Sequence, residues 1–459
     1  MPRPVTPIIS AGDRRLRGEM PLPPEVLLTP TLVERGPHPA AAGLMVVGAF
    51  LTGYQLLHLG GINVTLADCA FLLAFAIGLA RGQLTAMPFG AATPFWLIGL
   101  TMMLGGLFLG SLYHIDMTRW LIIAFQYLVG FLALPMLLMA QPEALARRLV
   151  AAFIIGIFVM EALGIVASLT MTHAQAAAIF SDDFLAGNGR LSSFASEPNW
   201  NGAIIAFTLP LLIYAYSTRI LPTWFAAIAA PLLGWALMLS ASFTGFSAAM
   251  VAIAITLLFL GMRYIGGTLL LAAVAASIFF ASGAPVPSIF EKRVGSAISS
   301  GDIEEAGTYK GRVELIKLAW HTADRTLIVG LGADRFRTTN EIKQPVHNLY
   351  LLMLVEGGLM SFGGLLMLVA LLFWMPISRL AYNRIEAGMA LAVVSVFVIY
   401  SQSSPHLFSR LIIVPVLLAL LILSKSDRGR IQTSYAARPV RPLRRDPTGI
   451  AQPDPAAIR

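Results

Sequence analysis

Residues 203–215 read AIIAFTLPLLIYA, and residues 250–260 read MVAIAITLLFL. Such nearly uninterrupted apolar runs are typical of membrane-spanning helices, because a helix on the surface of a soluble protein keeps a polar face. Of the 459 residues, 57% are hydrophobic and 12% are charged, and the mean hydropathy is +0.76. Soluble chains are about 45–50% apolar and about 25% charged. The composition therefore excludes a soluble enzyme, a disordered chain and a nucleic-acid-binding domain, and the continuous runs exclude a β-barrel, whose strands alternate.

Apolar segments close to the roughly 20 residues that a membrane-spanning helix needs recur along the chain. The sequence therefore predicts an all-α fold, a polytopic transmembrane helical bundle of about 12 spans. An even number of spans places both termini on the same side of the membrane. The predicted spans are 40–58, 63–80, 93–112, 119–140, 148–170, 200–217, 223–241, 244–260, 265–282, 347–373, 386–403 and 408–424.

The arginines indicate the orientation, because basic residues concentrate in cytoplasmic loops. With both ends cytoplasmic, the short outer loops hold Arg119 and Arg410, and the short inner loops hold a larger set. Both tails are also rich in arginine, so the formal charge of +8 reflects orientation and not a nucleic-acid partner. We expect a disordered basic tail at 1–39, a transmembrane domain at 40–424 and a disordered Arg/Pro-rich tail at 425–459. The inner-loop arginines are Arg81, Arg147, Arg148, Arg219, Arg263, Arg379 and Arg384.

Two longer segments, 171–199 and 283–346, fall on the outer side. The second is too long to be a simple connection and contains a predicted amphipathic helix at 309–323. We therefore expect a long, partly helical outer loop at 283–346. The apolar stripe of its helix is predicted to consist of Val313, Ile316, Ala319, Trp320 and Ala323.

Three outer residues could carry chemistry: Arg190, Arg312 and His347. Arginine binds phosphate oxygens through a planar fork and keeps its charge, and histidine can accept a proton near neutral pH. At a helix N-terminus the dipole disfavours the protonated imidazole, which would keep His347 available as a base. The alternative remains open that the arginines face solvent or lipid headgroups and that the histidine is an interfacial polar residue.

Other polar residues favour structural roles. Glu161 and Glu356 lie within predicted spans, where an unpaired carboxylate is costly, so we expect them to pair inside the bundle. Asp68 lies near the outer end of its span, and we expect it to be solvated. The single cysteine, Cys69, allows neither an intramolecular disulfide nor a thiolate metal site, and the histidines lack ligand spacing, so no metal site is predicted.

Several strings resemble the superfamily of O-antigen ligases and O-antigen or exopolysaccharide polymerases. The string at 347–358, HNLYLLMLVEGG, is similar to its signature of a His-Asn pair that opens a transmembrane helix. GRVELIKLAW at 311–320 and IVGLGADRF at 328–336 resemble its periplasmic-loop pattern. RLSSFASEPNWNG at 190–202 resembles its Arg-containing segment, and SASFTG at 240–245 matches the place of its Ser/Thr-rich turn. The resemblance covers about 63–424 in matching order.

The resemblance implies a metal-independent, inverting membrane glycosyltransferase without a cofactor. It would move a glycan from a polyprenyl (undecaprenyl) diphosphate donor to the hydroxyl of a glycan or lipid A-core acceptor, on the periplasmic face of the bacterial inner membrane. His347 would be the base or position the acceptor, and Arg312 and Arg190 would hold the diphosphate. The substrate contacts it implies are Arg190, Arg312, Glu197, Asn199 and Asn348.

The string SEPNW at 196–200 stands where members often have a Gly-Asn-Pro-Asn-like string, and this departure favours a polymerase slightly over a ligase. A chain-length regulator or other polysaccharide assembly protein would then be a partner, and no nucleic acid would be. The alternative from another class is a transporter or flippase for a lipid-linked glycan. A transporter should show repeated halves and charges along a central path, whereas the charges here gather in the outer loops.

Overall fold

The structure, a computed structural model, describes residues 36–57, 64–261, 264–269, 273, 277, 286–300 and 309–436. Within these residues every regular element is a helix, and the extended backbone pairs once, in a bridge between Leu185 and Leu191. This confirms the predicted all-α fold class. Inside a bilayer a helix satisfies its backbone N–H and C=O groups within its own segment, so apolar runs of this kind fold as helices. Most of the two predicted tails lies outside the described residues.

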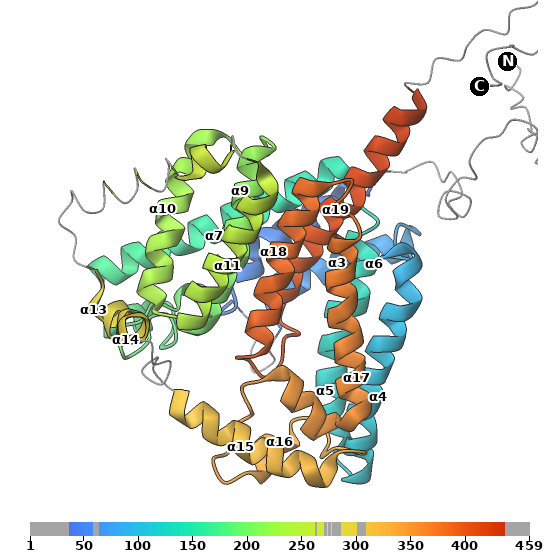
Figure 1. Ribbon diagram of the computed structural model, residues 1–459, viewed down its shortest axis with the longest axis vertical. Helices are drawn as coiled ribbons and strands as arrows, with labels where there is room; N and C mark the ends of the chain where they lie inside the picture. The colour runs from blue at the N-terminus through green and yellow to red at the C-terminus, as the bar shows by residue number, and fades with distance from the viewer. Residues whose placement is uncertain are drawn as a thin grey trace, which may run out of the picture.

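The helices follow one another along the chain with short connections, apart from the outer segments (Figure 1). They are α2 (Pro39–Phe50), η1 (Leu51–Gly53), α3 (Leu66–Ala80), η2 (Gly90–Ala92), α4 (Thr93–Tyr113), α5 (Met117–Leu128), η3 (Val129–Ala133), α6 (Leu134–Leu138), α7 (Glu143–Thr170), α8 (His173–Ile179), η4 (Ser193–Ala195), α9 (Pro198–Ser217), α10 (Thr223–Ser240), α11 (Phe243–Leu260), α13 (Ser288–Phe290), η5 (Glu291–Gly295), α14 (Ser296–Ser300), α15 (Tyr309–Thr326), α16 (Arg335–Thr339), α17 (Leu349–Ile377), α18 (Arg384–Ser401) and α19 (Arg410–Ala436).

Eight helices among the described residues are long and apolar enough to cross a membrane. The predicted first two spans correspond to shorter apolar helices, Pro39–Gly53 and Leu66–Ala80. The predicted ninth span, 265–282, lies largely outside the described residues, so the number twelve stays a prediction. α19 covers the predicted last span and continues to Ala436, so residues 425–436 are helical where we expected a disordered tail to begin. The eight helices are Gly90–Tyr113, Met117–Leu138, Glu143–Thr170, Pro198–Ser217, Thr223–Ser240, Phe243–Leu260, Leu349–Ile377 and Arg384–Ser401.

Two helices form the centre of the bundle. Residues 411–423 of α19 and 201–212 of α9 are buried at every position. A helix that is apolar on all sides is one that other helices surround, and α19 packs against α6, α7, α9 and α18. The core of the described bundle is therefore built around α9 and α19.

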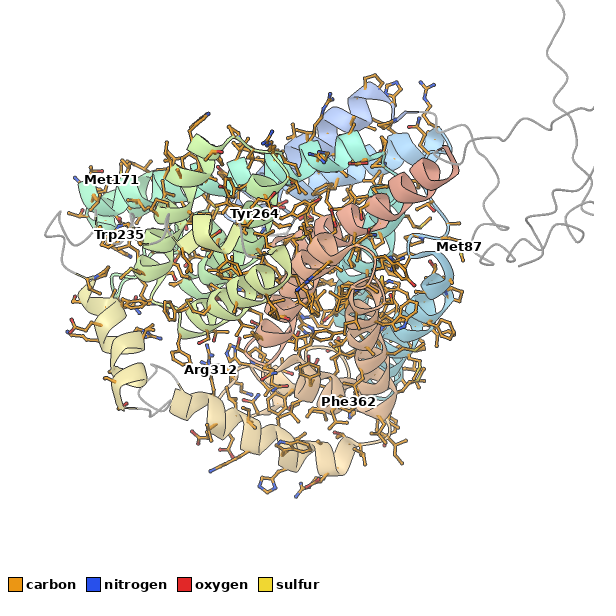
Figure 2. All side chains as sticks on the ribbon, turned by 45° about the horizontal axis from the view of Figure 1, so that its top comes forward. Met87, Met171, Trp235, Tyr264, Arg312 and Phe362 are labelled. Atoms are coloured by element: carbon orange, nitrogen blue, oxygen red, sulfur yellow. The ribbon has the colours of Figure 1, made fainter. Side chains whose placement is uncertain are left out.

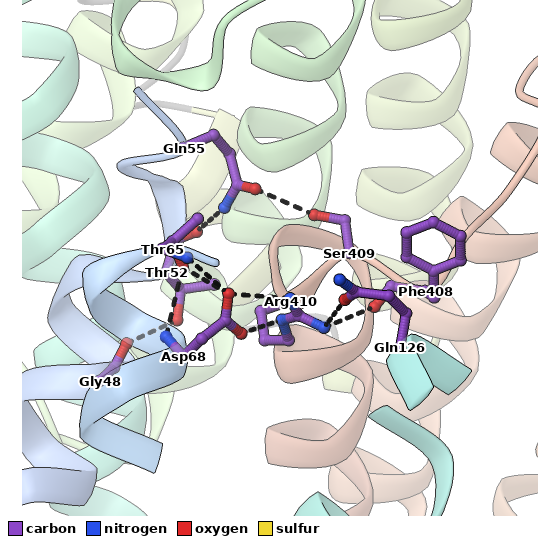
Figure 3. Close-up of polar contacts among 9 residues, drawn as sticks. All are labelled: Gly48, Thr52, Gln55, Thr65, Asp68, Gln126, Phe408, Ser409 and Arg410. Carbon is purple, nitrogen blue, oxygen red and sulfur yellow. Dashed lines mark hydrogen bonds and ion pairs between the residues drawn. The ribbon is translucent and has the colours of Figure 1, made fainter. Parts of the chain in front are cut away.

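A buried ion pair fixes the point where α19 begins (Figure 3). Arg410 donates from Nη2 to Asp68 Oδ2 at 2.8 Å and from Nη1 to Gln126 Oε1 at 2.7 Å, and its Nε also pairs with the Asp68 carboxylate. Asp68 is 2% exposed, so the expectation that it is solvated was wrong. A carboxylate in this position needs a charged or hydrogen-bonded partner, and the chain supplies it from a segment far away in sequence.

Glu356 joins the outer loop to α17. Its Oε2 accepts a hydrogen bond from the Asp334 amide at 2.7 Å, and its Oε1 accepts one from the Phe336 amide at 3.2 Å. Its backbone carbonyl accepts a third from the Gly332 amide at 2.8 Å. The carboxylate therefore sits at the first turn of α16, where amides have no partner within the helix. The expectation of a structural role inside the bundle agrees with these contacts.

Glycines bring three backbones into contact beside Glu356. A Cβ on Gly330 would lie 2.4 Å from the Glu356 carbonyl oxygen, and one on Gly110 would lie 2.5 Å from the Gly332 nitrogen. Gly330 and Gly332 have φ of +76° and +96°, values that glycine adopts without strain. We call Gly106, Gly110, Gly330, Gly332 and Gly357 the glycine junction, where α4, α17 and the turn before α16 meet.

The predicted amphipathic helix is present as α15, which lies across one end of the bundle (Figure 1). Leu315, Ala319 and Ala323 are buried in a small cluster with residues of α17. Trp320 is 56% exposed, so its place on the predicted apolar stripe was wrong. The helix turns a face centred on Ala319 to α17, and Trp320 points about 100° away from the centre of that face.

We predict that Glu356→Ala lowers the thermal unfolding temperature of the purified protein and exposes residues 327–340 to protease. Two buried amides would lose their acceptor, at about 1–3 kcal/mol for each. Glu341→Ala is the control, because Glu341 is an exposed carboxylate in the same loop. Equal unfolding temperatures for the two variants would show that Glu356 does not anchor the loop.

Candidate functional site

Arg190 is the best-anchored member of the predicted site. It is 6% exposed, and its Nε donates to the Ser240 carbonyl at 2.7 Å. Ser240 is the last residue of α10, where carbonyls have no partner within the helix, so the arginine satisfies one of them. Its Nη2 donates to Asn199 Oδ1 at 2.8 Å. The structure thus brings together two residues predicted for the site and the predicted Ser/Thr-rich turn.

Close packing of α9 on α11 holds this arrangement. A Cβ on Gly202 would lie 2.7 Å from Ser242 Cβ, and one on Gly245 would lie 2.8 Å from Gly202 Cα. Small residues of this kind let membrane helices approach closely. Tyr400 of α18 donates from its hydroxyl to the Asn199 carbonyl at 3.0 Å. Sequence reasoning missed Tyr400, which looks like an ordinary interfacial aromatic residue.

Arg312 and His347 lie near each other, at the starts of α15 and α17. Arg312 lies in the first turns of α15, and Figure 2 shows it on the side of that helix that faces the bundle. His347 is half-buried just before α17. Burial lowers the pKa of the imidazole below its ordinary value, and the nearby positive charge of Arg312 lowers it further. Most of the His347 imidazole is therefore uncharged at pH 7.

Asn348 caps α17. Its side-chain oxygen accepts a hydrogen bond from the Leu351 amide at 3.0 Å, and its backbone is extended. A capping asparagine fixes the direction in which the chain enters a helix. The capping role explains why asparagine follows the histidine, since Asn348 holds His347 next to the N-terminus of α17. The sequence predicted Asn348 as a substrate contact, and that role stays a prediction.

Arg293 of η5 is a third cation that sequence reasoning missed. Burial, together with the positive charges of Arg293 and Arg312, lowers the pKa of Arg190 to about 10. The pKa of Arg312 is lowered by burial and then by Arg293. All three guanidinium groups stay charged at pH 7, and each disfavours the charge of its neighbours. A basic residue in a long polar loop carries no sequence signal that separates it from a solvated one.

Glu197 is the acidic residue of this cluster. Burial raises the pKa of its carboxyl group, Asp183 raises it further, and Arg190 and Arg312 lower it in part. We call Arg190, Arg293, Arg312, Glu197 and His347 the arginine site. With Glu197 ionised, its formal charge is three positive minus one negative, or +2. Such a half-buried site is suited to a ligand with two or more negative charges, because an anion relieves the repulsion between the arginines.

Comparison with known proteins agrees with this arrangement. Residues 225–368 match the family described as O-antigen ligase, which confirms the resemblance to the O-antigen ligase and polymerase superfamily. The match supports a glycosyltransferase-like enzyme in a membrane, with a lipid-linked glycan donor and a glycan acceptor. Together with the apolar helices it indicates a multi-pass membrane protein. No curated protein matches the chain.

The lowered pKa of His347 predicts that its reaction with diethyl pyrocarbonate continues at pH values below the ordinary histidine pKa of about 6.5. The reagent modifies the neutral imidazole, and mass spectrometry of the His347 peptide measures the rate against pH. In Arg312→Gln the nearby positive charge is absent, so the pKa of His347 rises. The midpoint of the curve of modification rate against pH then moves to higher pH.

Arg325→Gln is the matched control, because Arg325 is an exposed arginine at the other end of α15. Its midpoint should equal that of the wild type. A midpoint that Arg312→Gln leaves unchanged would mean that Arg312 and His347 do not share a site.

Proposed function

We propose, from the O-antigen ligase match at 225–368 and the geometry of the arginine site, that the protein transfers a glycan from a polyprenyl diphosphate to an acceptor hydroxyl. Undecaprenyl diphosphate is the carrier that we propose. The observation that carries the proposal is the cluster of Arg190, Arg293 and Arg312 beside a neutral His347. Three cations fit a diphosphate, and a neutral imidazole fits a hydroxyl that must lose its proton.

In the proposed reaction His347 accepts the proton of the acceptor hydroxyl, and the oxygen forms a bond to the anomeric carbon. The bond between that carbon and the diphosphate oxygen breaks, and its electron pair leaves with the diphosphate. One displacement inverts the anomeric configuration and needs no enzyme nucleophile. Negative charge grows on the leaving group as the bond breaks, where fixed arginine cations stabilise it more than they stabilise the bound donor.

We propose that the reaction needs no metal ion, because the arginines neutralise the diphosphate themselves. Arg190 is held by Ser240 and Asn199, so it is oriented before the donor binds. A preorganised cation costs no reorganisation when charge develops. In a metal-dependent enzyme, a divalent ion would supply this stabilisation of the diphosphate charge.

The proposed setting is the periplasmic face of the inner membrane, with both termini in the cytoplasm. The arginine distribution between loops supports this orientation. Between the two activities of the superfamily we favour the polymerase, on the SEPNW string at 196–200. A reaction that contains the lipid-linked donor and no other acceptor distinguishes the two activities. A polymerase joins repeat units that are all carried on the lipid, and a ligase needs a separate acceptor such as the lipid A core.

The transfer assay uses full-length protein in nanodiscs with the polyprenyl-diphosphate-linked repeat unit, with and without lipid A-core acceptor. We predict that Arg312→Ala lowers the rate by about 100–1,000-fold and that Arg312→Lys, which keeps the charge and loses the fork, is less impaired. His347→Ala should lower the rate by about 100–10,000-fold.

His321→Ala is the control, because His321 is an exposed histidine on α15. Folded protein is quantified beside transfer by size-exclusion chromatography. Near-normal rates in both Arg312→Ala and His347→Ala at normal abundance would refute the proposed site. Loss of activity that follows loss of folded protein would give these residues a structural role.

A separate prediction concerns metal. Transfer by wild-type protein should proceed at an undiminished rate in excess EDTA, since the arginines balance the donor's charge. Inactivation by EDTA that a divalent ion reverses would contradict the metal-independent mechanism.

A further inference from the structure

A cavity of about 400 Å³ lies beside the arginine site. It is lined by residues from the segments before and within α9, from α16 and from the loop between α18 and α19. Ser196 and Trp200 line it, and they flank Glu197 and Asn199, of which Asn199 bonds Arg190 and Glu197 lies near it. The cavity and the arginine site are therefore neighbours at the first turn of α9.

The charges of the cavity balance. Asp334 accepts hydrogen bonds from Arg119 and, at 2.8 Å, from Arg337, so two cations share this carboxylate. Asp183 supplies a second carboxylate to the lining. Burial lowers the pKa of His406 to about 4, so its ring is neutral at pH 7. Two positive and two negative groups give no net charge, in contrast to the +2 of the arginine site, and so the cavity does not select a diphosphate.

The lining instead combines rings with hydrogen-bonding groups. Trp200, His406 and Phe408 supply aromatic surface, and Ser409 supplies a hydroxyl group. His406 Nδ1 lies 3.2 Å from the Tyr127 hydroxyl, and within the described residues its buried Nε2 has no hydrogen-bond partner. A buried polar atom without a partner at the wall of a cavity points to a ligand that supplies one. Asp183 is exposed and lines the cavity, so its carboxylate is accessible to a ligand there.

A sugar ring fits this combination. The C–H face of a pyranose is apolar and packs on an aromatic ring, while its hydroxyl groups form hydrogen bonds with carboxylates, hydroxyls and imidazole. A volume of about 400 Å³ falls in the range of sites for small ligands, about 300–1,000 Å³. Pro345 also lines the cavity, two residues before His347, so a sugar held there would lie close to the proposed base.

We infer that this cavity binds one or two sugar residues of the acceptor glycan and presents a hydroxyl group to His347. The inference rests on the proposed glycan transfer and adds where the acceptor binds. The donor is held by charge at the arginine site, and the acceptor is held by stacking and neutral hydrogen bonds in the adjoining cavity. This division lets the two substrates bind independently.

The test measures binding of sugars that carry no diphosphate. Full-length protein in nanodiscs is titrated calorimetrically with two probes: core oligosaccharide released from the host lipopolysaccharide by mild acid, and repeat-unit oligosaccharide freed from its carrier. We expect one of them to bind, which also tells a ligase from a polymerase. Asp183→Asn should weaken binding by about tenfold, the effect of one hydrogen bond to a charged group. Trp200→Leu should weaken it at least as much.

Asp182→Asn is the matched control, since Asp182 is the exposed neighbour of Asp183 and does not line the cavity. It should bind as the wild type does, and Arg312→Ala should also keep sugar binding. Unfolding temperatures identify any variant that fails to fold, and Asp183→Asn tests the cavity even if Trp200→Leu does not fold. The inference is overturned if neither probe binds the wild type, if Asp183→Asn binds as tightly as Asp182→Asn, or if Arg312→Ala abolishes binding.

The readouts separate this inference from the proposed function. If the variants change sugar binding as expected but no glycan is transferred from the lipid diphosphate, the cavity assignment is supported and the proposed reaction is refuted. Transfer by the wild type with an acceptor KM that Asp183→Asn and Trp200→Leu do not change would remove the cavity assignment and leave the reaction.

Discussion

The hydrogen bonds from the amides of Asp334 and Phe336 to the Glu356 carboxylate hold the segment before and within α16 to the helical bundle. A carboxylate within a membrane helix must find donors, and these amides are donors that α16 itself leaves unpaired. Three consequences follow from this contact. The glycine junction closes beside it, α15 packs on α17, and His347 and Arg312, which sit at the starts of these two helices, are held at one end of the bundle.

The arginine site is assembled from parts that have little else in common. Arg190 comes from the loop before α9, Arg293 from η5 and Arg312 from α15. Their mutual repulsion works against folding, and hydrogen bonds to Ser240 and Asn199 offset it for the most buried of them. Holding the three arginines together lowers the stability of the fold. Such a site is suited to an anion, because a bound anion removes the repulsion between the arginines and the fixed groups need not move.

The arginine site and the cavity differ in charge, and the proposed transfer uses this difference. In that proposal the net positive charge of the arginine site binds the diphosphate of the donor. In the cavity the charges cancel, so the proposed binding of the acceptor depends on stacking and hydrogen bonds. The N-terminal turn of α9 contributes to both, through Asn199 to the arginine site and through Trp200 to the cavity. Consecutive residues of a helix point about 100° apart, so two neighbouring positions of one turn can contribute to two adjoining sites.

The sequence by itself determined the class of fold, because uninterrupted apolar runs have no stable form in a bilayer other than a helix. It also indicated Arg190, Arg312 and His347, since strings of residues in matching order carry a resemblance without knowledge of contacts. It did not indicate Arg293 or Tyr400, whose importance lies in which residues they approach and not in local spacing. It misplaced Asp68 and Trp320 for the same reason: whether a polar or aromatic residue at a helix end meets water or a partner depends on segments hundreds of positions away, as with Arg410 for Asp68. Helix formation is a property of each segment, whereas the charge, burial and pKa of a site arise only when the segments pack.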